Sequence, residues 1–189
     1  MNLPNILTVS RFFWTIIFIY LLGRNSLSAT ILAAVVFIVA ALTDLLDGYL
    51  ARKNDLITDL GKILDPVADK FLILAAFIMF VRLGVLETWM VVLVFIREVA
   101  VTLSRIARLR RGQVIAAEKA GKIKTVFQIV SISVILLFLI LDHSSFSRNW
   151  SASVENGWGA LINVLMFATV LLTVNSGVSY FLDLRKPAV

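Results

Sequence analysis

Six apolar stretches, each about as long as a bilayer is thick, constrain what this 189-residue chain can fold into. They fall near residues 6–23, 29–51, 65–86, 88–108, 123–142 and 158–182. A helix of roughly 17–25 apolar residues crosses the hydrocarbon core and satisfies its own backbone hydrogen bonds there. Charged residues make up only 16% of the chain, against about 25% in soluble domains. We therefore expect an all-α, polytopic membrane protein with six transmembrane helices, folded as a single domain over residues 1–189.

Lysine and arginine gather on one side of these predicted spans. With six spans, that side contains both chain ends and the segments 52–64 and 109–122. Together with the adjoining helix ends it holds thirteen of the eighteen basic residues, and the opposite side holds Arg24, Arg82 and Arg148. Basic residues are retained in the cytoplasm, so both termini and the segment 52–64 are predicted to be cytoplasmic. The expected location is a bacterial inner or plasma membrane. The net charge of +6 then indicates contact with anionic membrane lipid and no nucleic acid partner.

Four aspartates lie where the second and third apolar stretches approach each other. Asp44 and Asp47 are three residues apart and Asp65 and Asp69 four apart, so each pair shares a helix face. Carboxylates are costly in apolar helices unless they are paired or bind a cation. Helix capping or pairing with Arg or Lys accounts for any one aspartate equally well. Four at these spacings, in a chain without cysteine, favour a divalent metal site with oxygen ligands.

Small and basic residues accompany the first aspartate pair. Gly48 and Ala51 continue its stripe at helical spacing, and they leave room for a ligand to approach the backbone. Arg52 ends the stripe with a fixed positive charge suited to phosphate oxygens. A metal pair held by the carboxylates would polarise a phosphoryl group and neutralise a departing phosphate. These residues therefore indicate phosphoryl-transfer chemistry.

Three further residues carry expectations about local structure. The third helix is expected to open at Asp65, with Pro66 in its first turn. Asp59 then falls in a polar connector, solvated or capping a helix. The only histidine, His143, is expected to be a solvated residue of an outer loop.

The segment from Asp44 to Asp69 resembles the signature of the CDP-alcohol phosphotransferase family. It reads D-x-x-D-G-x-x-A-R-x8-G-x-x-x-D-x-x-x-D, and all eight specified positions match. The resemblance covers the six-helix layout and implies two divalent cations, Mg²⁺ or Mn²⁺, held by all four aspartates. It implies that Asp69 is the general base that deprotonates the acceptor alcohol, and that the enzyme is a homodimer. The CDP-lipid contacts that it implies are Asp47, Gly48, Ala51, Arg52 and Gly61.

Three shorter motifs look like the glycerol-phosphate branch of this family. They are NLPNILTVSR at the N-terminus, REVAVTLSR in the fourth apolar stretch and GKIKT at the start of the fifth. The resemblance suggests that Pro4, Asn5 and Thr8 help to frame the nucleotide site. It also suggests that the acceptor phosphate is attracted by Arg105, Lys122 and Lys124. Basic residues beside a phosphoryl-transfer site suit an acceptor that itself carries phosphate.

The charged residues of these motifs also suit roles outside acceptor binding. Arg105 and Lys122 could belong, with Arg108, to an anchor on anionic lipid at the inner face. Arg97 and Glu98 lie well inside an apolar stretch, so we expect them to pair with one another, with other helices or with a ligand.

The resemblance implies transfer of the phosphatidyl group from CDP-diacylglycerol to glycerol 3-phosphate, which gives phosphatidylglycerophosphate and CMP. An alternative is a member of the same family whose acceptor is serine, an inositol phosphate or phosphatidylglycerol. A cation transporter with buried aspartates is the alternative from a different class. All four aspartates lie within about two turns of one predicted membrane boundary, which argues against access from both sides.

Overall fold

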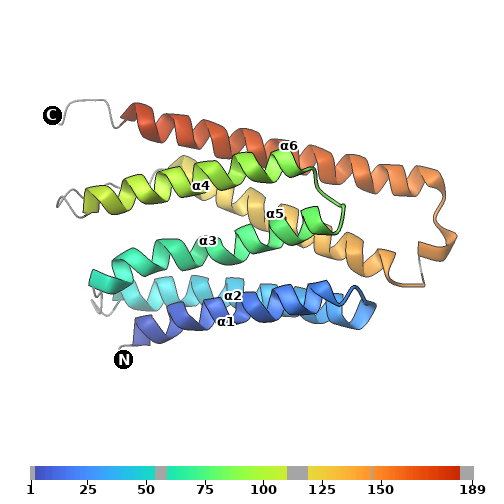
Figure 1. Cartoon of the computed structure of the whole chain (residues 1–189), viewed down its shortest axis with the longest axis horizontal. Helices are drawn as coiled ribbons and strands as arrows, with labels where there is room; N and C mark the ends of the chain where they lie inside the picture. The colour runs from blue at the N-terminus through green and yellow to red at the C-terminus, as the bar shows by residue number, and fades with distance from the viewer. Residues whose placement is uncertain (1–2, 54–58, 110–118, 146, 184–189) are drawn as a thin grey trace. The chain divides into compact units, whose positions relative to one another are not determined.

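Six α-helices and one short 3-10 helix make up the described part of the chain, which contains no strand (Figure 1). The computed structural model describes residues 3–53, 59–109, 119–145 and 147–183. The all-α prediction is confirmed for these residues. The elements are α1 (Leu3–Gly23), α2 (Leu27–Lys53), α3 (Asp59–Arg82), α4 (Thr88–Leu109), α5 (Lys119–Asp142), η1 (Ser147–Asn149) and α6 (Ala152–Asp183).

The third helix differs most from its predicted bounds. It begins at Asp59, so the prediction that it opens at Asp65 with Pro66 in its first turn is wrong. A prediction from apolar stretches misses a first turn that contains polar residues. Such a turn can be helical without burying an apolar face. The helix ends at Arg82 because Gly84 adopts a left-handed conformation with φ 75°, and its N–H bonds to the carbonyl of Val81 at 3.0 Å.

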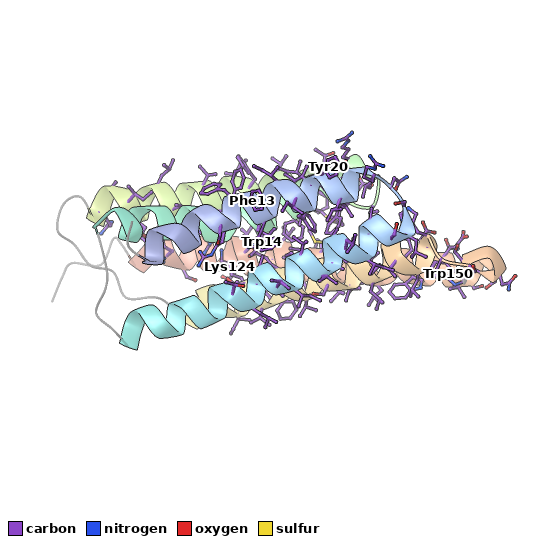
Figure 2. The ribbon with its side chains drawn as sticks, turned by 90° about the horizontal axis from the view of Figure 1, so that it is seen from below. Phe13, Trp14, Tyr20, Lys124 and Trp150 are labelled. Atoms are coloured by element: carbon purple, nitrogen blue, oxygen red, sulfur yellow. The ribbon has the colours of Figure 1, made fainter. Side chains whose placement is uncertain are left out.

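Two of the helices are long and apolar enough to cross a membrane, within the part of the chain that is described. They span Ile123–Asp142 in α5 and Ala152–Leu182 in α6, and Ser10–Gly23 is a shorter apolar segment. Large apolar side chains are also exposed on α1. Phe13 is 61% and Tyr20 62% exposed, and both are labelled along this helix in Figure 2. Being seven residues apart, they share one face, and such a face suits lipid better than water.

The described residues divide into two compact units, each considered by itself. The first comprises Met1–Phe80 and Leu136–Asn149. In it α1 packs against α2, with Phe18 and Phe37 buried between them at a ring-centroid distance of 6.1 Å. Asn25 makes the turn between the two helices with a φ of 48°, a conformation that asparagine tolerates better than most residues. The single domain over residues 1–189 stays a prediction.

The histidine belongs to this first unit and is not simply solvated. His143 is half-buried, and its Nε2 lies 3.1 Å from Oδ1 of Asn25. Its Nδ1 lies 3.4 Å from Oγ1 of Thr30, which is fully buried. The position in a loop is confirmed, but the ring is more than a solvated side chain, because it joins the end of α5 to the turn between α1 and α2.

The second unit comprises Val81–Ile135 and Trp150–Val189, and its interior mixes apolar and polar side chains. Here α4 packs against α6, and Val94, Ile132 and Met166 are fully buried. Ser131 of α5 and Thr169 of α6 are also buried, and their hydroxyl oxygens are 2.9 Å apart. Buried polar groups need such partners, so side-chain hydrogen bonds help to hold α5 against α6.

Candidate active site

The four predicted metal ligands lie on two consecutive helices. Asp44 and Asp47 belong to the last three turns of α2, and Asp65 and Asp69 to the first three turns of α3. The prediction that each pair is helical is confirmed, so each pair shares a helix face. Their side chains lie outside the described residues. How the carboxylates point toward one another stays a prediction.

The remaining residues of the aspartate signature are also helical. Gly48, Ala51 and Arg52 follow in α2. Gly61 lies in the first turn of α3, whereas a helix opening at Asp65 would have left it in the connector. The proposed nucleotide residues open α1, and they are Pro4, Asn5 and Thr8. The side chains of all these residues lie outside the described part, so their ligand contacts stay predictions.

The donor chemistry of the aspartates fits divalent cations. Only a short segment separates the end of α2 at Lys53 from the start of α3 at Asp59. Four carboxylates without thiol or imidazole form the hard oxygen set that Mg²⁺ and Mn²⁺ prefer. Among the residues with described side chains, no three His, Cys, Asp or Glu gather as a metal-binding group. The aspartate signature therefore fits such ions by its donor chemistry.

Arg97 and Glu98 form an ion pair in the middle of α4. Nη1 of Arg97 donates to Oε1 of Glu98 at 3.2 Å, which confirms the prediction that they pair with one another. Nη2 of Arg97 donates to Oγ of Ser176 on α6 at 2.8 Å. The same arginine therefore connects its neighbouring carboxylate to a second helix.

The carboxylate of Glu98 also receives donors from α5. Its Oε1 accepts a hydrogen bond from Nζ of Lys124 and a longer one, at 3.4 Å, from Nε2 of Gln128. Glu98 is 2% and Lys124 5% exposed, so the pair is shielded from solvent. We call Arg97, Glu98, Lys124, Gln128 and Ser176 the polar cluster. Lys124, labelled in Figure 2, was predicted to attract the acceptor phosphate, and that role stays a prediction.

Arg105 lies on the same face of α4 as Glu98, seven residues further along. It is half-buried, and its Nε is buried without a hydrogen-bond partner among the described residues. Burying a donor without a partner is unfavourable, so this position suits a guanidinium that meets an oxygen-rich ligand. Lys122 lies in the first turn of α5, and its side chain is outside the described part.

Sequence reasoning missed several members and neighbours of the polar cluster. Gln128 follows Lys124 by four residues and is 2% exposed. Ser176 and Gly177 are small residues of α6, and Gly177 lies against Arg97. The available signal was the spacing of Lys124 and Gln128, since polar residues four apart in an apolar helix share a face. Nothing in the sequence indicated α6 as the partner of Arg97.

The comparisons define the class of protein. A strongly apolar, all-helical chain with paired aspartates on consecutive helices fits a transferase that acts on phosphorylated lipid. A family model described as CDP-alcohol phosphatidyltransferase matches residues 1–175. The chain belongs to this family.

Curated relatives resemble the chain over most of its length. A CDP-diacylglycerol–glycerol-3-phosphate 3-phosphatidyltransferase of Bacillus subtilis (strain 168) is 37% identical over 193 residues, covering 95% of this chain and 93% of the relative. A probable phosphatidylglycerophosphate synthase of Mycobacterium tuberculosis is 38% identical over 182 residues, covering 95% of this chain and 79% of the relative. A CDP-diacylglycerol–glycerol-3-phosphate 3-phosphatidyltransferase of Rickettsia bellii is 31% identical over 185 residues, covering 98% of this chain and 96% of the relative.

Proposed function

We propose that this chain transfers the phosphatidyl group of CDP-diacylglycerol to glycerol 3-phosphate, forming phosphatidylglycerophosphate and CMP in phospholipid synthesis. The observation that carries the proposal is the likeness, over 95% of the chain, to a relative named for this transfer. The complete aspartate signature from Asp44 to Asp69 supports it, because the chemistry of that donor set suits phosphoryl transfer. The basic residues on α4 and α5 support an acceptor that carries phosphate.

In the proposed reaction the hydroxyl oxygen of glycerol 3-phosphate attacks the phosphorus that bears diacylglycerol. A new phosphorus–oxygen bond forms while the bond to the CMP phosphate oxygen breaks, and CMP departs. Asp69 accepts the proton of the hydroxyl group, for which it needs only hydrogen-bond reach. Divalent cations, when bound by the four aspartates, would offset the negative charge that develops on the departing CMP.

The other residues of the signature are proposed to bind and orient the two substrates. Arg52 pairs with the diphosphate, and Gly48, Ala51 and Gly61 leave room for the CDP group beside the helix backbone. The proposed frame of the nucleotide comes from α1, at Pro4, Asn5 and Thr8. The proposed contacts of the acceptor phosphate are Arg105, Lys122 and Lys124, with the buried Nε of Arg105 as support.

We further propose a multi-pass protein of the cell membrane with six spans, cytoplasmic termini and a site that faces the cytoplasm. The six helices and the uneven distribution of basic residues support this topology. The proposed homodimer is supported by the family resemblance alone.

The test is CMP release by purified protein from CDP-diacylglycerol with a panel of alcohols. We expect release with glycerol 3-phosphate and none with serine, inositol phosphate or phosphatidylglycerol. An excess of chelator should stop the reaction, and Mg²⁺ or Mn²⁺ should restore it. Release with another alcohol and not with glycerol 3-phosphate would overturn the acceptor, and undiminished release in chelator would overturn the cations.

A further inference from the structure

We propose that Glu98 is a positioning residue for the acceptor site, which we define as Arg105, Lys122 and Lys124. It acts by holding the ammonium group of Lys124 and the guanidinium of Arg97, and does not itself contact the acceptor. This inference rests on the proposed function, because it concerns how the phosphate of the acceptor is recognised.

The first argument is that one carboxylate oxygen of Glu98 joins α4 to α5 directly, and joins α4 to α6 through Arg97. Oε1 of Glu98, on α4, accepts hydrogen bonds from Lys124 and Gln128, both on α5. It also accepts one from Arg97, whose other terminal nitrogen donates to Ser176 on α6. The hydroxyl of Ser176 in turn donates to the carbonyl of Thr173 at 3.1 Å. Glu98 is therefore the residue at which the side-chain contacts of α4, α5 and α6 meet.

The second argument concerns the charge of Lys124. A buried ammonium is unfavourable unless a carboxylate and hydrogen bonds compensate for lost hydration, and Glu98 is that carboxylate. A free lysine side chain samples many rotamers, and an ion pair with a buried carboxylate restricts that freedom. The low local dielectric strengthens the contact compared with one at the surface. Removing the charge of Glu98 should therefore loosen the hold on Lys124.

The third argument links Glu98 to Arg105. The two residues are seven apart on one face of α4, and Val101 and Thr102 on the same face are buried. Lys122 and Lys124 lie in the first two turns of α5. The contact between Glu98 and Lys124 thus fixes the helix that carries Arg105 against the helix that carries both lysines. The distance between Arg105 and the two lysines therefore depends on the contact between Glu98 and Lys124.

The test compares Glu98→Gln with Ser131→Ala in the CMP release assay, varying each substrate separately. Glutamine keeps the shape and an acceptor oxygen but removes the charge. We expect the KM for glycerol 3-phosphate to rise about tenfold and the KM for CDP-diacylglycerol to stay within about twofold. Ser131→Ala removes a buried hydrogen bond of the same unit that does not involve Glu98, so it should leave both KM values unchanged.

A double-mutant cycle separates positioning from a purely structural role. In a Lys124→Met background, Glu98→Gln should raise the KM for glycerol 3-phosphate by much less than about tenfold, because the group it holds is gone. Equal changes in both KM values, or full additivity with Lys124→Met, would overturn the proposal. If Glu98→Gln does not fold, Glu98→Asp carries the test. It keeps the charge on a shorter side chain, and an unchanged KM for glycerol 3-phosphate would again overturn the proposal.

Failure of this inference differs from failure of the proposed function. If the wild-type chain releases CMP with glycerol 3-phosphate and the Glu98 variants match it in both KM values, only the role of Glu98 falls. If the wild-type chain releases no CMP with glycerol 3-phosphate, the proposed function falls, and the positioning role falls with it.

Discussion

Gly177 of α6 lies directly against the side chain of Arg97 on α4. A β-carbon at position 177 would lie 2.9 Å from Cγ of Arg97 and 3.3 Å from its Nε. The absence of a side chain thus makes room for the arginine stem, while its guanidinium donates to Glu98 and Ser176. Small residues commonly allow such close approach between apolar helices.

Replacing this glycine tests the fit. Gly177→Ala should gain about 1 kcal/mol of helix propensity but displace a guanidinium whose charge-assisted hydrogen bonds contribute about 1.5–3 kcal/mol. We expect a net loss of about 1 kcal/mol, seen as an apparent Tm lower by about 2–4 °C in detergent. Gly157→Ala on the same helix is the matched control, because nothing lies within 4 Å of its added β-carbon. If both variants raised the Tm equally, displacement of the Arg97 side chain would cost no stability, and the prediction would be contradicted.

Asp69→Asn tests the proposed general base. The amide cannot accept the hydroxyl proton and is a weaker cation ligand, so the rate of CMP release should fall by a factor on the order of 10²–10⁴. The variant should still insert and keep its helical circular dichroism. Asp59→Asn, at the start of the same helix and at a position that the signature leaves unspecified, should keep wild-type turnover. A wild-type rate in Asp69→Asn would remove the assigned role.

Arg105→Ala tests recognition of the acceptor phosphate. Loss of charge-assisted hydrogen bonds worth about 1.5–3 kcal/mol predicts a KM for glycerol 3-phosphate higher by about 10–100-fold. The KM for CDP-diacylglycerol should change much less, as measured by steady-state kinetics with each substrate varied. Arg108→Ala, one turn further along α4, is the control for a basic residue that anchors on lipid. Equal effects on both substrates would instead assign Arg105 a structural role.

Single cysteines test the proposed topology, and the chain has no native cysteine to contribute background. Ser145→Cys, exposed between α5 and α6, should react with a membrane-impermeant maleimide on intact cells. Ala188→Cys near the C-terminus should react only after the membrane is permeabilised. Gel-shift labelling reads out both positions. The reverse pattern would invert the orientation, and labelling of both in intact cells would contradict six spans.

The helices were predictable from sequence because an apolar stretch of spanning length has few other stable forms. The aspartate signature was recognisable because its spacing fits a helix and its residue types suit one chemistry. The start of α3 at Asp59 was missed, since polar residues at a helix end leave no apolar pattern. The contact between Arg97 and Ser176 was also missed, because a polar residue in an apolar helix does not indicate which helix it faces.

His143 has a consequence for the order in which this protein is built. Its hydrogen bonds join residues 113 and 118 positions apart in the chain. A ribosome adds roughly 5–20 residues per second, so about 6–23 s separate synthesis of Thr30 from that of His143. The hairpin of α1 and α2 is therefore synthesised early. It lacks the hydrogen bonds from Asn25 and Thr30 to His143 until most of the polypeptide has emerged.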